Sequence, residues 1–245
     1  MNKTYCFTDL HGEWRLWEQI KNYLDDSDIV YCLGDCLDRG SKGLEILEDI
    51  LADPRVIFIR GNHEDEFLKF FSNPDKYGYY NWELPPDYKK MNKYSFDKKQ
   101  KLLKRLKNTP VKKVYINKQG QEIHLSHAGF NPNLPYITND DYLWNRDHIF
   151  SSPECFKEDK YKNIYIIHGH TPVISKSHWG LTPLEDLTTG VKIKEYGYGH
   201  KFCLDLGSFR SYRAALFNLD TLKVEKYFED EVKIKNGNRK RNYSF

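Results

Sequence analysis

Three short apolar runs in the first 60 residues are each followed by a polar motif and then by a helical pattern. The runs cover residues 4–8, 29–33 and 55–60, and their aromatic and β-branched side chains are typical of buried strands. Strands that alternate with helices predict an α/β fold with a mostly parallel sheet. Ligands bind such sheets at the carboxyl ends of the strands, so the polar motifs are expected to meet at one edge.

Five polar motifs follow one another along the chain. The second motif and the third, taken with Arg60 before it, each have five or more specified positions, and the others are short. Aspartate, histidine and asparagine recur in them, and these residues offer the oxygen and imidazole ligands that divalent transition metals accept. The motifs are Asp9-Leu10-His11, Gly34-Asp35-Cys36-Leu37-Asp38-Arg39-Gly40, Gly61-Asn62-His63-Glu64, His127-Ala128-Gly129 and Gly169-His170-Thr171-Pro172.

The motifs supply enough ligands for two divalent cations that share one carboxylate. Such paired ions lie about 3.5–4 Å apart and activate a bridging hydroxide for attack on a phosphate ester. Carboxylate, amide and imidazole ligands suit manganese, which we expect first, or iron or zinc. We expect one cation to be bound by Asp9, His11 and Asp35, and the other by Asp35, Asn62, His127 and His170.

The remaining chain predicts one domain, at residues 1–231, with an insert and a basic tail. Residues 73–110 form the insert, which we expect to be mainly helical, to lie near the mouth of the site and to select substrate. Its many lysines either attract a polyanion or form a solvated helix face. A hairpin is predicted at 111–126, further strands at 164–167, 202–206, 212–219 and 222–228, and the tail at 232–245.

Composition excludes several classes of protein. The formal charge of +3 does not call for stable binding to nucleic acid or to an anionic membrane. No apolar run approaches the ~20 residues that span a bilayer, and no signal-peptide pattern opens the chain. The five cysteines contain no Cys-x-x-Cys pair, so we expect reduced, buried thiols in a cytoplasmic protein.

From residue 4 to about residue 219, the motifs resemble those of the phosphoprotein phosphatase family of calcineurin-like metallophosphoesterases. The resemblance implies a β-sandwich of two mixed sheets flanked by helices, with the two metals at one edge. The segment Asp205-Leu206-Gly207-Ser208 is closest to the compact bacterial and phage type of serine/threonine phosphatase.

The resemblance also implies roles for residues beside the metal ligands. Arg39 and Arg146 would bind the phosphate oxygens, because a guanidinium donates two parallel hydrogen bonds, and Asn62 would lie beside them. His63 would protonate the leaving oxygen, with Asp38 holding its imidazole charged and oriented. His168 is expected behind the ligands or in the core, and His170 is the expected ligand.

Three functions remain open from the sequence. The first is a phosphomonoesterase that acts on phosphoserine and phosphothreonine in proteins. The second is a symmetrical diadenosine tetraphosphate hydrolase, in which Tyr77, Tyr79 and Tyr80 would stack on adenine unless they pack against one another. The third is a catalytically silent binding module that keeps the fold. The intact ligand set, with His63 beside its aspartate partner, favours an enzyme.

Overall fold

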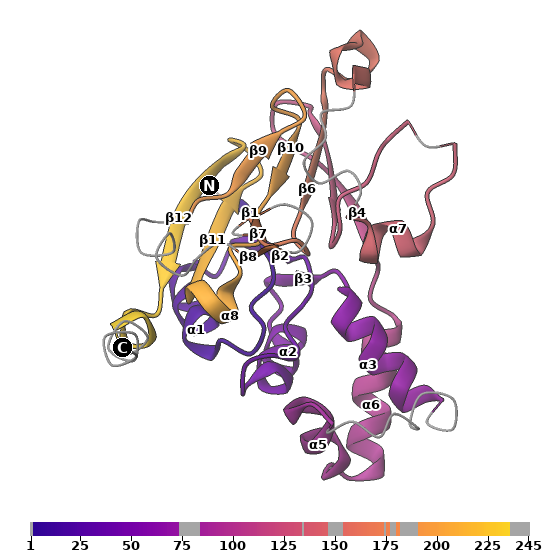
Figure 1. Ribbon diagram of the computed structural model, residues 1–245, viewed down its shortest axis with the longest axis vertical. Coiled ribbons are helices and arrows are strands. Elements are labelled where there is room, and N and C mark those ends of the chain that lie inside the picture. Colours follow the sequence, from indigo (N-terminus) through magenta and orange to yellow (C-terminus); the bar gives the residue numbers. More distant parts are fainter. Residues whose placement is uncertain are drawn as a thin grey trace.

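Two five-stranded sheets form the centre of the molecule (Figure 1). The structure is a computed structural model and describes residues 2–73, 84–133, 135–146, 154–173, 175–176, 180–181 and 191–235. The strands of the first sheet are, in spatial order, β12 (Lys223–Glu229), β11 (Arg213–Asn218), β1 (Thr4–Phe7), β2 (Ile29–Cys32) and β3 (Val56–Phe58). Those of the second are β4 (Lys112–Ile116), β5 (Glu122–Ser126), β6 (Ile164–His168), β10 (Lys201–Cys203) and β9 (Lys194–Tyr196).

Both sheets are mixed. Strands β1, β2 and β3 are parallel, as the alternation of strands and helices predicts, but β11 is antiparallel to β1. In the second sheet β5, β6 and β10 are parallel, and antiparallel β4 and β9 form its edges. A short turn joins β11 to β12 and forces these two strands to be antiparallel. The prediction of a mostly parallel sheet is therefore corrected, and the prediction of two mixed sheets is confirmed.

Side chains of the first sheet alternate between two apolar layers, because successive residues of a strand point to opposite faces. On β1, Cys6 packs between the two sheets with Leu125 of β5 and Phe202 of β10. Tyr5 and Phe7 point the other way, into a second apolar cluster formed with the helices. The first sheet is thus buried on both faces, which holds the carboxyl ends of β1, β2 and β3 in fixed positions.

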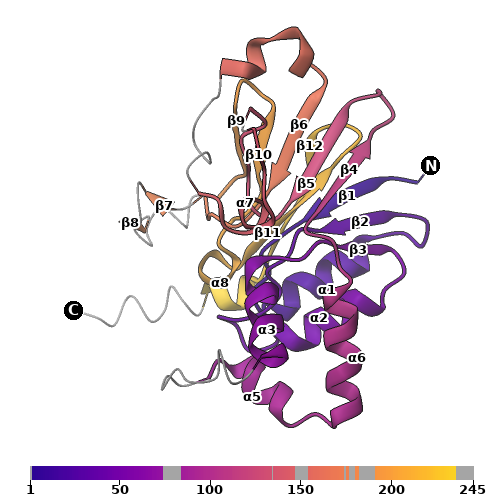
Figure 2. The same cartoon turned by 90° about the vertical axis from the view of Figure 1, so that its right-hand side faces the viewer.

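Five helices gather on one side of the sandwich, in the lower half of both views (Figures 1 and 2). Apolar residues at helical spacing bury one face of each long helix; Trp17, for example, is buried and donates a hydrogen bond from Nε1 to Asp49 Oδ2 at 2.7 Å. The helices are α1 (Trp14–Tyr23), α2 (Gly43–Ala52), α3 (Asn62–Ser72), α5 (Pro86–Asn92) and α6 (Phe96–Lys107).

Short elements cover the outer face of the second sheet. Phe130, Tyr142 and Phe156 pack there against Ile166 of β6. These elements are α7 (Asn139–Trp144) and the 3₁₀ turns η1 (Glu154–Lys157) and η2 (Asp159–Tyr161). The remaining elements are a two-stranded sheet, formed by β7 (Ser175–Lys176) and β8 (Gly180–Leu181), and the short helix α8 (Ser208–Ser211). Neither α7 nor β9 is predicted from the sequence.

The described part of the insert contains α5 and α6. Two of its lysines pair with acidic residues of α2: Lys98 lies 2.9 Å from Glu48, and Lys90 contacts Glu45. Helix α6 lies along α3, the helix that begins at Asn62 (Figure 2). The tyrosine cluster at residues 77–80 lies outside the described residues.

All five cysteines are free and buried, as expected. No helix among the described residues is both long and apolar enough to cross a membrane.

Candidate metal centre

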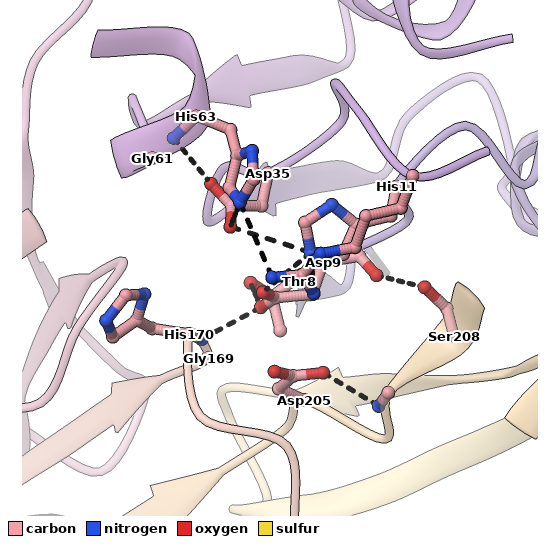
Figure 3. Close-up of polar contacts among 12 residues, drawn as sticks. Thr8, Asp9, His11, Asp35, Gly61, His63, Gly169, His170, Asp205 and Ser208 are labelled. Atoms are coloured by element: carbon pink, nitrogen blue, oxygen red, sulfur yellow. Dashed lines mark hydrogen bonds and ion pairs between the residues drawn. The ribbon is translucent and has the colours of Figure 1, made fainter. Parts of the chain in front are cut away.

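The predicted ligands come together at the end of the sandwich, although up to 161 positions separate them. Figure 3 shows Asp9, His11, Asp35 and His170 among them. Each lies just beyond a strand or at the first turn of a helix, where the chain leaves the sheet. All are almost completely buried. The β1–α1 loop carries Asp9 and His11, the β2–α2 loop carries Asp35, α3 begins with Asn62 and His63, and His127 and His170 follow β5 and β6.

The loops hold these residues in an unusual backbone conformation. Nine non-glycine residues in the described parts of the chain have a positive φ, and six of them belong to the predicted site. A left-handed conformation costs an L-residue roughly 1–2 kcal/mol, and such strain gathers at functional sites. The six are Asp9, His11, Asp35, Asp38, Arg39 and His170.

Glycine is required at two positions of the motifs, because the backbone there lies very close to a carboxylate of another loop. A Cβ atom on Gly169 would lie 2.0 Å from Asp9 Oδ2, and one on Gly61 would lie 2.3 Å from Asp35 Oδ1. Neither contact is compatible with a side chain, so only glycine lets these loops close around the carboxylates.

Four electron-pair donor atoms converge at one point. His127 Nε2 lies 2.8 Å from Asn62 Oδ1, 3.1 Å from His170 Nδ1 and 3.3 Å from Asp35 Oδ2. His170 Nδ1 and Asn62 Oδ1 are 3.0 Å apart. Bonds of about 2.0–2.2 Å to one cation place neighbouring ligands about 3.0–3.5 Å apart. The donor set and its spacing therefore fit a divalent metal.

Backbone carbonyls orient two of the histidines. His127 Nδ1 donates to the carbonyl oxygen of Leu33 at 2.8 Å, and His11 Nδ1 donates to that of Leu37 at 2.9 Å. Metal-binding histidines commonly donate their second ring nitrogen in this way, which leaves the other nitrogen with a lone pair. In both residues the atom left for a ligand is Nε2.

A second group shares Asp35 with the first. His11 Nε2 lies 3.6 Å from Asp35 Oδ2 and 3.8 Å from Asp9 Oδ1. Asp9 Oδ1 is buried and has no hydrogen-bond partner in the described structure, whereas its Oδ2 accepts from the His170 backbone at 3.0 Å. His11, Asp35 and His63 also lie close enough to share an ion. The sequence predicts that His63 lies beside the metals and is not one of their ligands.

The carboxylates attract positive charge into this buried region. Burial lowers the pKa of His127, but the nearby Asp35 outweighs it and raises the pKa to about 10. His63 behaves in the same way, because Asp35 and Asp38 overcome the effect of burial and raise its pKa to about 9. Burial instead lowers the pKa of His11 to about 3, which keeps its imidazole neutral.

His63 and two arginines line the approach to the ligands. His63 Nδ1 lies 2.7 Å from Asp38 Oδ2, so its Nε2 points toward Asp35, 3.8 Å from Oδ2. Arg39 lies 2.9 Å from His11 Nε2 through Nη1, with its guanidinium over the ring of Phe209. Arg146 donates to Thr171 Oγ1 at 2.9 Å, next to His170.

His168 is not part of this group. His168 is buried, lies 2.9 Å from the Gly169 carbonyl through Nδ1, and lies 2.5 Å from the Tyr196 hydroxyl through Nε2. Both ring nitrogens therefore have hydrogen-bond partners within the protein, which agrees with the position behind the ligands or in the core that the sequence predicts.

Two carboxylates support the loops of the site in a way that the sequence does not predict. Glu64 belongs to the third motif, and Asp87 lies outside the motifs. Glu64 is fully buried, and its oxygens accept hydrogen bonds from the backbone of Asp35, Cys36, Leu37 and Gly61 at 2.8–3.1 Å. Asp87, in the first turn of α5, accepts from the backbone N–H groups of Asp38 and Leu44, both at 2.8 Å. The insert thus fastens the loop that carries Asp38 and Arg39.

Replacing Asp87 by alanine is expected to destabilise the protein and to slow the reaction without loss of metal. Each buried N–H left unsatisfied costs about 1–3 kcal/mol, so the melting temperature should fall. A loosened loop should lower kcat/KM by roughly 10- to 100-fold, because small misplacements of catalytic groups cost that much. Calorimetry, kinetics and elemental analysis check the three effects. Asp97→Ala, in the exposed first turn of α6, is the control; equal effects of both variants would contradict the role of Asp87.

The fold and the buried ligand cluster define a metal-dependent hydrolase of phosphate esters. The sequence matches the family model described as calcineurin-like phosphoesterase over residues 3–203, and the chain belongs to this family. The resemblance read from the motifs is thereby confirmed.

Three relatives show how the chain stands within the family. It is 26% identical to serine/threonine-protein phosphatase 2 of Salmonella typhimurium over 224 residues, which cover 86% of this chain and 90% of that protein. It is 28% identical to the symmetrical bis(5'-nucleosyl)-tetraphosphatase of Buchnera aphidicola, over 32% of this chain and 36% of that protein. A crystal structure of a candidate diadenosine tetraphosphatase shares the fold, with a TM-score of 0.57, 14% identity and 93% of each chain covered.

Proposed function

We propose that this protein removes phosphate from phosphoserine and phosphothreonine in proteins, using two divalent cations. The observation that carries the proposal is that Asp35 belongs to two groups of ligand atoms. One is the buried group with His127 and His170, and the other contains His11, whose Nε2 lies 3.6 Å from Asp35 and 3.8 Å from Asp9, so the arrangement suits a pair of neighbouring ions. Asp9, His11 and Asp35 hold one cation, and Asp35, Asn62, His127 and His170 hold the other.

The cations, when bound, supply Lewis-acid chemistry and a nucleophile at neutral pH. Arg39 and Arg146 bind the equatorial oxygens of the phosphoryl group and stabilise the charge that develops there. The Arg39 guanidinium lies over the Phe209 ring near His11, and Arg146 donates to Thr171, so both guanidinium groups lie beside the ligands. Asn62, at the first turn of α3, precedes His63 and would contact the substrate beside it.

His63 protonates the leaving alkoxide. The hydrogen bond to Asp38 fixes its ring and favours the protonated form, which is the form that an acid needs. Its side chain is 18% exposed, whereas those of His11 and His127 are 1% and 0% exposed. Access from solvent supports a role at the substrate rather than behind the metals.

The share of the chain that each relative matches supports a protein phosphatase over a nucleotide hydrolase. The match to the serine/threonine phosphatase covers most of both chains, whereas the match to the tetraphosphatase covers about a third of each. A symmetrical dinucleoside tetraphosphate remains the second candidate substrate, because the relative from Buchnera aphidicola is a symmetrical bis(5'-nucleosyl)-tetraphosphatase.

An assay with three substrates tests this proposal. Protein loaded with manganese should hydrolyse p-nitrophenyl phosphate and a phosphothreonine peptide and should act poorly on diadenosine tetraphosphate. The reverse preference would establish the nucleotide hydrolase, and no turnover of any substrate would establish a silent binding module. Chelation should abolish turnover, and readdition of metal should restore it, because the proposed nucleophile is generated by the metals.

Elemental analysis of the purified protein identifies the metal. We propose manganese, with iron and zinc as the alternatives that the same ligands accept. The five free, buried cysteines support a reducing location such as the cytoplasm.

A further inference from the structure

Asp205 is a buried carboxylate beside the metal centre to which the preceding mechanism gives no role. It lies between β10 and α8 and is 1% exposed. Its Oδ1 accepts a hydrogen bond from the Gly207 backbone at 2.7 Å. Its Oδ2 is buried and has no hydrogen-bond partner in the described structure. An oxygen in this state costs free energy unless another group compensates for it.

Asp205 lies next to Asp9. In Figure 3 its carboxyl group is below that of Asp9, on the side away from Asp35 and His63. Burial raises the pKa of Asp205, and the negative charge of the neighbouring Asp9 raises it further. A hydrogen bond joins the two loops that carry these residues, because Ser208, which follows Asp205 in the chain, donates from Oγ to the backbone carbonyl of Asp9.

Two unpartnered oxygens therefore belong to this pair of carboxylates, Asp9 Oδ1 and Asp205 Oδ2. Arg39 and Arg146 attract Asp205, but neither donates a hydrogen bond to Oδ2. Two buried carboxylates that repel each other are stabilised when a cation lies close to both.

The two proposed cations differ in how many protein atoms surround them. The group around His127 has four converging donor atoms, whereas the cation of Asp9 has only three assigned protein ligands. A further carboxylate beside Asp9 would add negative charge where the protein ligands are fewer. Acidic groups just behind metal ligands commonly change metal affinity by about 10- to 100-fold.

We propose that Asp205 is an additional acidic residue of the metal centre, where its Oδ2 helps to hold the cation bound by Asp9. The inference rests on the proposed two-cation function and gives a metal-binding role to Asp205, which lies outside the five polar motifs. Asp205 acts through the metal, and not on the substrate, so it is a positioning residue.

Titration of the metal-free protein with manganese tests the role of Asp205. Asp205→Asn keeps the size of the side chain and the oxygen that accepts from Gly207, but it removes the charge. The wild-type protein should bind two ions. In the variant, the dissociation constant of one ion should rise by about 10- to 100-fold, and that of the other should stay unchanged. Unchanged affinities for both ions would overturn the proposal.

Asp230→Asn is a matched control. Asp230 is 2% exposed and also has an unpartnered Oδ2, but it follows β12 and lies 3.5 Å from Arg15. This variant should bind both ions as tightly as the wild-type protein does. A wild-type protein that binds fewer than two ions would contradict the proposed function itself, so the two failures are distinguishable.

Anomalous diffraction from manganese-loaded wild-type crystals needs no variant and covers the case in which Asp205→Asn does not fold. Oδ2 of Asp205 should lie within about 5 Å of the ion on Asp9, the reach of a direct bond or of one bridging water. A longer distance would remove Asp205 from the centre.

Discussion

Replacing Asp35 by asparagine is expected to abolish turnover and to weaken the retention of both metals. Its Oδ2 lies 3.3 Å from His127 Nε2 and 3.6 Å from His11 Nε2, so one charge serves both groups of ligands. Loss of a single preorganised electrostatic group already slows enzymes by about 10²–10³-fold, and here two cations are affected. We expect a loss of at least about 10³-fold in kcat, with metal content measured by mass spectrometry.

Asp53→Asn is the control for this change. Asp53 is also buried and charged, but it pairs with Arg55 at 2.8 Å on the helical side of the molecule. That variant should lose stability and keep both ions. Two ions retained per chain in Asp35→Asn would show that Asp35 does not bridge them.

Replacing His63 by asparagine is expected to lower kcat by about 10²–10⁴-fold toward a phosphothreonine peptide, the usual contribution of a general acid. The loss should be much smaller toward p-nitrophenyl phosphate, because p-nitrophenolate departs without a proton. Metal content should stay unchanged, which separates an acid from a ligand. The comparison matters because His63 lies close enough to His11 and Asp35 to share an ion.

His124→Asn serves as the control for His63. His124 is half-buried on β5 and pairs with Glu122 at 2.6 Å, away from the ligands. It should leave both rates unchanged. Equal losses on the two substrates in His63→Asn would exclude the acid role, and loss of one metal ion would instead make His63 a ligand.

The order of the elements near the amino terminus could be predicted because it depends on local patterns. Residues 4–8, 29–33 and 55–60 form strands where their side-chain types indicate them, with ends displaced by one or two residues. The antiparallel pairing of β11 with β1 is not local, because Cys6 pairs with Phe217 across 211 positions. Only the resemblance to a known family anticipated the second sheet.

The sequence by itself determined which ligand types are present and the order in which they follow the strands, since both are written in short motifs. Only the tertiary structure decided which atoms converge. It selects Nε2 of His127 through the Leu33 carbonyl, 94 positions away, and it brings Asp87 to the backbone of Asp38 and Asp205 next to Asp9. The reason is physical: the orientation of a side chain and the electrostatics of a buried carboxylate depend on neighbours that folding brings from distant parts of the chain.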